Sequence, residues 1–354
     1  MRESIYHFKP VGHNTPDQKR NYPEPDPRLR KAFKEWFKEV EDVTIRDLDE
    51  QVIDFYNKAL ELTKDLEPNI PEAHSLLVAY QDHEKIEYAG LFLSAIYNRS
   101  PEKEIVFDLH LQNPPYGLGY KLRKGKRLIN RGKAGIGLGY MALGAVINYD
   151  KAGDWLGYRA PGVVINYGKT GYGMGCGAPG VVINFGETGF GLGRGASEAV
   201  INYGKANNGM GYGTSGLVIN YGEAGGWMGW KAPGVVINFG KAGHDMGRYA
   251  SGLVINCGEA NEEMGEWIEG IILALKDPIS FGDISKAKLV LRAEDCKKIP
   301  ELGEYLENLR RTLEVGKKDY QAVLAWLEGL GEEPKERIES DIEKILRRAG
   351  YIQF

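Results

Sequence analysis

The stretch from Gly162 to Pro179 reads G-V-V-I-N-Y-G-K-T-G-Y-G-M-G-C-G-A-P, and close variants of this 18-residue text recur without insertion along the middle of the chain. Ile precedes the Asn in every copy, and Tyr or Phe follows it in six of the eight copies. Self-similarity at a fixed period of this size is typical of solenoid proteins. The series of Asn residues, each 18 positions from the last, comprises Asn130, Asn148, Asn166, Asn184, Asn202, Asn220, Asn238 and Asn256.

The β-branched run G-V-V-I-N-Y within each repeat favours a strand. The fifth residue after each Asn is mostly Gly or Asn, as at Gly171 and Asn207, and these two types enter the left-handed region most easily. That position therefore predicts a corner of the coil. One coil cannot bury its own apolar side, whereas stacked coils can. We therefore predict a mainly β protein whose centre is a parallel β-solenoid.

Stacking at about 4.8 Å places each residue on its equivalent in the next coil. We expect an internal ladder in which each Asn amide bonds to the next, and a parallel ladder of Tyr and Phe rings. The third residue after Asn alternates in charge, which places opposite charges on adjacent coils and supports this register. That row reads Lys169, Glu187, Lys205, Glu223, Lys241 and Glu259.

The repeat fades at both ends, as terminal repeats of solenoids usually do. The segment 270–274 is a further coil with Ala274 at the Asn position, and 288–292 follows 18 residues later. Upstream, 105–110 favours a strand. We predict about ten coils over residues 104–293, between a helical N-terminal region (1–103) and a helical C-terminal region (294–354).

Helix signals in the flanks are Asp26-Pro27, an N-cap followed by a first-turn Pro, and Asp295, a second N-cap. The stretch 71–98 is ambiguous between helix and strand, and 90–97 also fits a poorly matched first coil. The helices that we expect run from Pro27 to about Val40, over 44–66, from Asp295 to about Leu313, and near 317–329 and 334–349.

The pattern of Gly171 to Thr188, G-x-x-[ML]-G-x-x-A-x-G-x-V-x-x-x-G-x-[AT], resembles the GXGXG β-helix domain. That domain forms the C-terminal part of the large subunit of glutamate synthase and most of one subunit of formylmethanofuran dehydrogenase. The resemblance covers about half of the chain. It implies a right-handed parallel β-helix with a structural and assembly role and no catalytic residues of its own.

The resemblance also implies that Val164 and Asn166 point inward. By alternation, Val163, Ile165 and Tyr167 then point outward and form three apolar stripes, a face too large to leave in water. Either the flanking helices or another subunit should cover that face. The opposite parity would instead place the Val and Asn stripes outside.

The amino-acid composition limits the class of protein and its location in the cell. The net charge of −4 implies no whole-chain attraction to nucleic acid or anionic membranes. No stretch is long and apolar enough to cross a bilayer, and the three Cys residues show no framework spacing, so we expect a cytoplasmic protein with free thiols. A composition rich in Glu, Lys and Arg and poor in Gln hints at a thermophilic source.

Positions that vary within a strict repeat are where function can reside. The sixth, seventh, tenth and eleventh residues after Asn include many Trp, Tyr and Arg, the residue types that favour protein interfaces and polymer binding. Packing against the terminal helices is the competing explanation. The candidate binding residues on this edge are Trp155, Tyr158, Arg194, Trp227, Trp230, His244, Asp245 and Arg248.

A second candidate is the basic stretch 121–127, extended by Arg131 and Lys133, which has no acidic residue. It could contact phosphates, as a nucleic-acid or other polyanion module would. The explanation that we prefer is a solvated edge of the first coil, which Lys and Arg protect against aggregation. Its candidate binding residues are Lys121, Arg123, Lys124, Lys126 and Arg127.

The sequence predicts no catalytic residues, no metal site and no cofactor. Gly-rich loops such as 171–177 resemble phosphate-binding loops, but no helix follows them and the Gly recur in every coil as corners. The His residues lack metal-binding spacing. Carboxylates of adjacent coils, Asp245 with Glu262 and Glu263, could converge as in solenoid enzymes that act on polymers.

Three functions therefore stay open. The leading expectation is a non-catalytic scaffold whose solenoid presents an apolar face and an aromatic, Arg-rich edge for self-association or for a protein partner. The second is a nucleic-acid or polyanion binding module that uses the basic stretch. The third is an enzyme that acts on a polymer in a solenoid groove.

Overall fold

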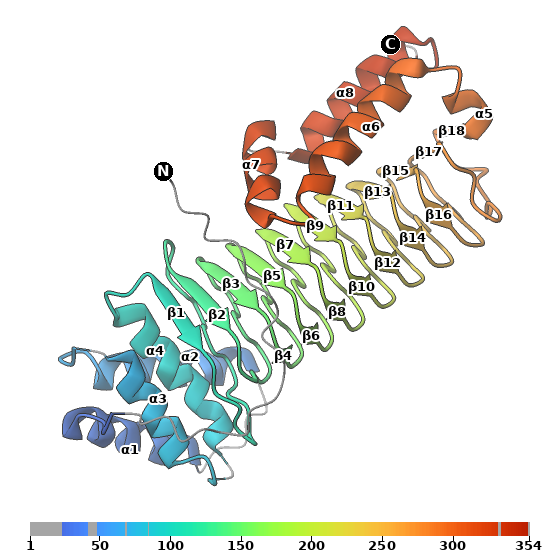
Figure 1. Cartoon of the computed structure of the whole chain (residues 1–354). Helices are drawn as coiled ribbons and strands as arrows, with labels where there is room; N and C mark the ends of the chain where they lie inside the picture. The colour runs from blue at the N-terminus through green and yellow to red at the C-terminus, as the bar shows by residue number, and fades with distance from the viewer. Residues whose placement is uncertain (1–22, 42–47, 68, 84, 332–333, 353–354) are drawn as a thin grey trace, which may run out of the picture.

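The computed structural model describes residues 23–41, 48–67, 69–83, 85–331 and 334–352. It is a parallel β-solenoid with helices at both ends (Figure 1). This is the fold class that the 18-residue repeat predicts.

The main sheet of the solenoid has 11 parallel strands, one from each coil. Strand starts advance by 18 residues nine times from Arg127 to Leu289, whereas the first coil, from Glu104 to Arg127, is longer. The strands are β1 (Glu104–Phe107), β2 (Arg127–Asn130), β3 (Ala145–Asn148), β5 (Val163–Asn166), β7 (Val181–Asn184), β9 (Ala199–Asn202), β11 (Leu217–Asn220), β13 (Val235–Asn238), β15 (Leu253–Asn256), β17 (Ile271–Ala274) and β18 (Leu289–Leu291).

A second parallel sheet is built from seven two-residue strands, which carry alternating Lys and Glu from Lys169 onward, whereas Lys151 and Lys169 pair as like charges. Lys205 pairs in register with both Glu187 and Glu223, as the charge alternation predicts. The strands are β4 (Lys151–Ala152), β6 (Lys169–Thr170), β8 (Glu187–Thr188), β10 (Lys205–Ala206), β12 (Glu223–Ala224), β14 (Lys241–Ala242) and β16 (Glu259–Ala260).

The ninth residue after each Asn is Gly for two physical reasons. Gly157 has a φ of 65°, in the left-handed region that side chains disfavour. A Cβ there would lie 2.4 Å from Cγ2 of Val164, so no side chain fits. The same backbone geometry and the same contact recur in the next coil at Gly175, with Val182.

The predicted facing of the strands is confirmed. Val164 and its equivalents belong to a hydrophobic cluster inside the solenoid, and Asn166 is fully buried. Ile165 and its equivalents belong to a second, separate cluster on the outer face. That outer cluster is buried as well, because the C-terminal helices pack onto it.

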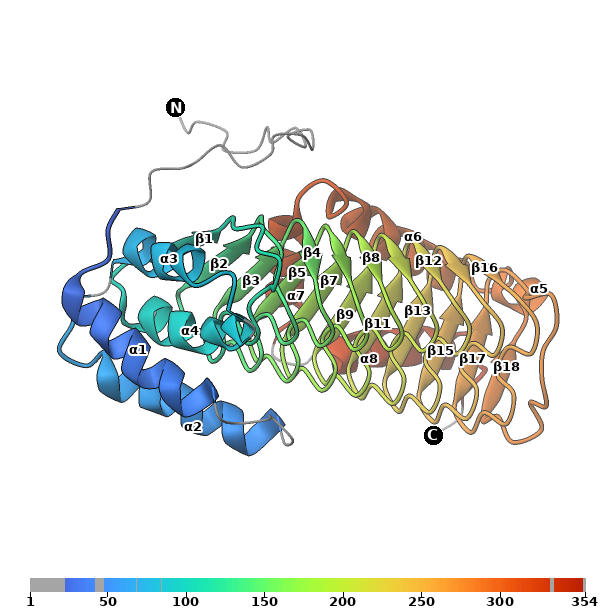
Figure 2. The same cartoon turned by 90° about the horizontal axis from the view of Figure 1, so that it is seen from below.

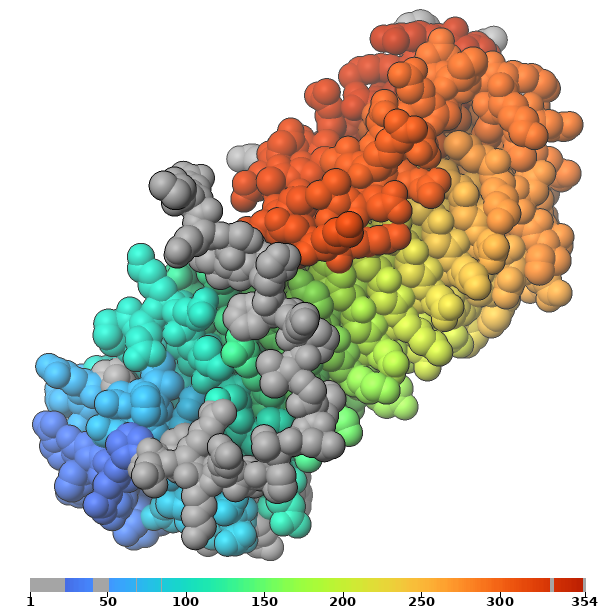
Figure 3. Space-filling view, in the orientation of Figure 1, coloured from blue at the N-terminus to red at the C-terminus, as the bar shows by residue number. Residues whose placement is uncertain are grey.

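The C-terminal helices lie along the outer face of the main sheet (Figure 3). In α6 the buried residues Leu302, Leu306, Leu309 and Leu313 recur at helical spacing and form one apolar stripe. Each outer-face Ile that such helices bury contributes about 1.5–3 kcal/mol. These elements are α5 (Ala293–Cys296), α6 (Pro300–Val315), α7 (Tyr320–Leu330) and α8 (Pro334–Arg348).

The prediction of a single helix from Asp295 to Leu313 was wrong. The segment forms two helices, α5 and α6, and Ile299 before Pro300 has a non-helical conformation, with φ −120° and ψ 77°. The ring of Pro disfavours a helical conformation for the residue before it, so the helix cannot run through this point.

The N-terminal helices close the other end of the solenoid (Figure 2). The alternative in which 90–97 forms a coil was wrong, since these residues lie within a helix, and part of the expected helix over 44–66 lies outside the described residues. The elements are α1 (Pro27–Glu41), α2 (Leu48–Leu62), α3 (Ile70–Ala79), the 3₁₀ turn η1 (Ile86–Tyr88) and α4 (Ala89–Arg99).

Helix α4 satisfies the backbone groups that the first coil leaves unpaired. The amide of Asn98 donates to the carbonyls of Tyr120 and Lys121, and its Oδ1 accepts from the N–H of Arg123 at 2.8 Å. The hydroxyl of Ser94 donates to the carbonyl of Gly117 at 2.8 Å. The interior cluster continues from the coils into α1–α4, so solenoid and cap share one core.

Candidate functional site

The Asn ladder lies inside the solenoid and offers no outer binding surface. Each Nδ2 donates to the Oδ1 of the Asn in the following coil at 2.6–2.9 Å, from Asn130 to Asn256. All eight side chains are fully buried. Asn202 also donates to the carbonyls of Gly204 and Glu223. The ladder therefore supports the fold.

The Gly N–H groups of the Gly-rich corner that the sequence singles out already have partners in the fold. Gly173 and Gly177 donate to carbonyls of the following coil, and Gly175 donates to the preceding one, all at 2.7–2.8 Å. Because stacking uses these donors, the corner is structural.

Three basic side chains of the stretch 121–127 already make contacts within the fold. Lys126 donates to the carbonyls of Ser100 and Glu102 at 2.6 and 2.7 Å, and burial, with the charge of Arg123 nearby, lowers its pKa. Arg127 forms an ion pair with Glu104 at 3.4 Å. Lys121 folds over the ring of Tyr120. Of the five candidates, Arg123 and Lys124 are exposed, and their side chains make no such contact with the part of the chain that the structure describes.

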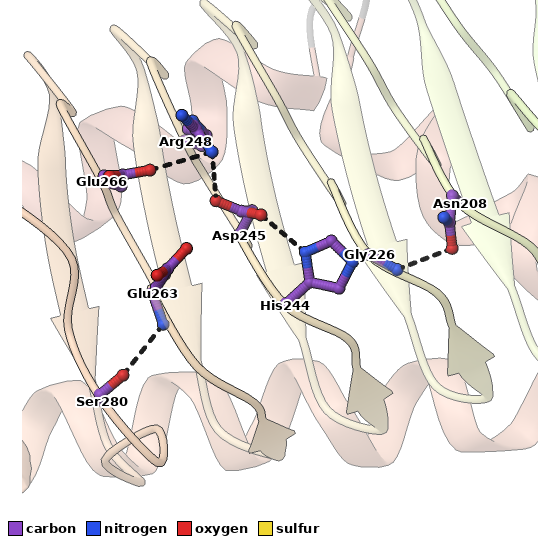
Figure 4. A network of polar contacts seen from close by, with 8 residues as sticks. All are labelled: Asn208, Gly226, His244, Asp245, Arg248, Glu263, Glu266 and Ser280. Carbon is purple, nitrogen blue, oxygen red and sulfur yellow. Dashed lines mark hydrogen bonds and ion pairs between the residues drawn. The ribbon is translucent and has the colours of Figure 1, made fainter.

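His244 and Asp245 belong to a network that crosses two coils (Figure 4). Asp245 accepts from Nδ1 of His244 at 2.6 Å and from Arg248 at 2.9 Å. Burial raises the pKa of Asp245, but these hydrogen bonds outweigh it and lower the pKa overall. Arg248 also lies 3.0 Å from Oε2 of Glu266. The buried carboxylate is thus held ionised between the imidazole of His244 and the guanidinium of Arg248.

The sequence predicts that the carboxylates of Asp245, Glu262 and Glu263 lie close together, and this prediction is wrong for Glu262. The carboxylates that approach one another, within 4.8 Å, are those of Asp245, Glu263 and Glu266. Glu262 contributes only its backbone carbonyl, which accepts from the N–H of Asp245. Arg248 pairs with two of these three carboxylates, Asp245 and Glu266, and so offsets part of the negative charge, which is the arrangement of a structural ion network.

The variable positions form a continuous edge that we call the aromatic corner. It consists of large aromatic and basic side chains at the sixth, seventh, tenth and eleventh positions after Asn. Its residues are Trp155, Tyr158, Arg159, Tyr172, Phe190, Arg194, Tyr212, Trp227, Trp230, Lys231, His244, Arg248, Tyr249 and Trp267.

Side chains of the aromatic corner contact one another along the stack of coils. Trp227 meets Trp230 at 5.4 Å and His244 at 5.7 Å between ring centroids. Basic side chains lie over rings: Arg194 over Tyr212 at 4.9 Å, and in other coils Arg159 over Tyr158 and Arg248 over Trp267. Yet Trp155, Tyr172 and Tyr249 stay 37%, 61% and 41% exposed. The edge is ordered and still open to solvent.

The backbone of the aromatic corner is strained. All ten non-Gly residues with positive φ in the described part of the chain lie at the seventh or eleventh position after Asn or at their counterpart in the first coil. Three central coils have Gly at both positions, so the fold does not need a side chain there. The residues are Lys121, Met141, Trp155, Arg159, Trp227, Lys231, Asp245, Tyr249, Glu263 and Trp267.

An aromatic ladder on another edge was expected, but the groove beside it was not. Rings of Tyr149, Tyr167, Phe185, Tyr203, Tyr221 and Phe239 stack at 4.7–5.4 Å. An open groove of about 630 Å³ runs between this ladder and the Lys/Glu row. The aromatic side of this groove also contacts the C-terminal helices, because the hydroxyls of Tyr203 and Tyr221 donate to backbone carbonyls of α6.

No protein-family profile, no curated protein and no solved structure matches the chain. The resemblance to the GXGXG β-helix domain therefore stays a prediction from the repeat. Within the described residues, no helix has both the length and the hydrophobicity for a transmembrane span.

Proposed function

We propose that this chain is a non-catalytic scaffold that docks a protein partner, or a second copy of itself, along the aromatic corner. The observation that carries the proposal is the strain at that corner. A non-Gly residue in the left-handed region costs about 1–2 kcal/mol, and the repeat itself shows that Gly serves at these positions. Backbone strain that the fold does not require points to function.

The side-chain chemistry agrees with this role. Trp, Tyr and Arg dominate binding hot spots, because they combine large apolar area with a polar group. At the corner, the basic side chains already lie over rings, so less conformational entropy is lost when a partner docks.

The location of the docking surface differs from the first expectation. The apolar face of the main sheet is occupied by α6, α7 and α8, which leaves it unavailable to a partner unless those helices move. The aromatic corner is a different edge of the solenoid and remains exposed. The proposal therefore places docking at the corner alone.

Three further parts of the proposal, namely the assembly role, the location and the type of source organism, rest on the sequence. The resemblance to the GXGXG β-helix domain supports an assembly role, and the three free thiols agree with a cytoplasmic location. A thermophilic source would fit the charged composition.

The test is capture of partners from the native source with the tagged chain. Bound protein is identified by mass spectrometry, and bound nucleic acid by nuclease sensitivity. A stoichiometric protein that is retained by the wild type and lost with a Trp155→Gly/Trp227→Gly variant supports the proposal. Nuclease-sensitive nucleic acid without protein would contradict it and point to Arg123 and Lys124 of the basic stretch.

A further inference from the structure

The two ends of the solenoid are closed in different ways. At the N-terminal end, α1–α4 extend the interior core beyond the first coil. At the other end, the C-terminal helices belong to the outer-face cluster, and no described helix residue after 274 joins the interior one. In Figure 2 the coil with β17 and β18 forms one tip of the molecule, with α5 at its side.

The interior of the last coil is correspondingly incomplete. Phe281, Ile284 and Val290 point to the interior cluster but are only half-buried, whereas their counterparts in central coils are fully buried. Ile279 is 70% exposed. The ring of Phe281 is partly shielded by the guanidinium of Arg292 at 5.0 Å. Apolar side chains therefore gather at this tip.

The tip also carries an open sheet edge. β18 is the terminal strand of the main sheet and has a strand partner on one side only in the described part of the chain. Its sequence, Leu-Val-Leu, is short but contains neither a charge nor a Pro, two of the features that protect edge strands. Such an edge is a template for pairing with a strand of another chain.

We propose that this tip is a dimer interface, at which a second copy of the chain stacks end to end about a two-fold axis. Two observations favour a second copy as the occupant. The opposite end is capped, so stacking cannot continue into a filament and closes at two chains. The tip also carries exposed charges of both signs, Asp277 and Asp283 with Lys286 and Lys288, so a two-fold contact between copies can pair opposite charges.

This inference uses a surface other than the aromatic corner, so either proposal can fail alone. The first test is the mass in solution by light scattering and sedimentation over a range of concentrations. The wild type should reach twice the chain mass of 39.4 kDa, and Ile279→Asp should raise the dissociation constant at least tenfold. The matched control is Leu143→Asp, which changes a side chain that is 51% exposed in an early coil and should leave the dimer intact.

Hydrogen exchange on the wild-type chain provides a second readout that does not depend on a variant. Amides of 279–291 should gain protection as concentration rises, while those of β3 and β5 should not change. A monomer at all concentrations would overturn the inference. So would a dimer that Ile279→Asp leaves unchanged, or open-ended filaments.

Discussion

At the residue scale, the Asn ladder is the most specific device of the fold. Asn202 accepts from Asn184 and donates to Asn220, both at 2.8 Å, and it is fully buried. Asn130, by contrast, starts the ladder, and its buried Oδ1 has no partner within the described residues. The two positions therefore differ in how many hydrogen bonds a substitution removes.

We expect Asn202→Ala to lower the free energy of unfolding by about 3 kcal/mol, because it leaves buried groups on both neighbouring coils unsatisfied. The matched variant Asn130→Ala should cost about 1 kcal/mol, since it removes one ladder bond. Urea unfolding followed by circular dichroism measures both. An equal loss of unfolding free energy in the two variants would contradict the idea that the stabilisation depends on how many ladder hydrogen bonds each Asn makes.

Strain at the aromatic corner gives a second prediction. Lys231 has a φ of 54° and an exposed side chain. Lys231→Gly relieves the strain but gives the unfolded chain more freedom, and these effects are about 1–2 and 0.5–1 kcal/mol. We expect the melting temperature to stay unchanged or to rise slightly. A clear fall would show that the fold itself depends on this side chain.

His74 gives a pH dependence whose sign follows from its burial. Burial lowers its pKa from 6.5 to about 4, with Asp108 opposing, and the ring bonds to the hydroxyl of Tyr97 at 2.7 Å. Between those pH values the unfolded chain binds the proton and the folded chain does not. Stability is therefore complete above pH 6.5 and falls as pH drops toward 4, by on the order of 3 kcal/mol.

Melting curves recorded from pH 7.5 to 4 measure this effect. His74→Gln should be less stable at neutral pH but should lose this part of the slope, because Gln does not titrate. The same slope in both proteins would assign the acid sensitivity to other groups.

At the element scale, the repeat predicted the coils well because each coil packs on a near-copy of itself. Val164 and Asn166 each stack on the equivalent residue 18 positions away, so the repeat identifies their neighbours. The docking of α6–α8 could not be predicted in this way. Their Leu and Ile stripes show that they cover something, but not which face of which element they cover.

Covering of the outer face by α6 predicts a local effect. Leu313 is fully buried against the sheet, whereas Val315, two residues later, is 58% exposed. Leu313→Asp should release the C-terminal helices, because it places a charge in an apolar contact. In hydrogen exchange, α6–α8 should lose protection while β7–β15 keep theirs, and Val315→Asp should change neither. Loss of protection throughout the chain would mean that helices and solenoid form one cooperative unit.

The candidate site was predicted less completely than the coils. Trp227, Arg248 and the other edge residues were found because they break a strict repeat. Glu266 was missed, because the tenth position after Asn holds Tyr, Cys, Arg or Trp elsewhere and its partners lie in a different coil. The groove beside the aromatic ladder was missed as well, since it is a shape formed by residues of several stacked coils rather than by a motif within one coil.

At the scale of the whole molecule, the solenoid is a rod that is capped at one end and covered on one face (Figures 1 and 2). Side chains of the aromatic corner stay exposed along another edge. Such a rod holds its surface residues at fixed intervals of about 4.8 Å per coil. That regular spacing suits a docking surface, and the strained Trp and Arg residues of the corner indicate where the surface lies.

The most direct test of this account is the affinity of wild type and variants for the protein that the tagged chain captures, measured by titration of purified components. The account predicts that Trp155→Gly/Trp227→Gly raises the dissociation constant at least tenfold while the melting temperature changes little. Glu263→Gly relieves the same backbone strain without removing a ring and should bind like the wild type. An unchanged dissociation constant in the double variant would contradict the aromatic corner as the docking surface.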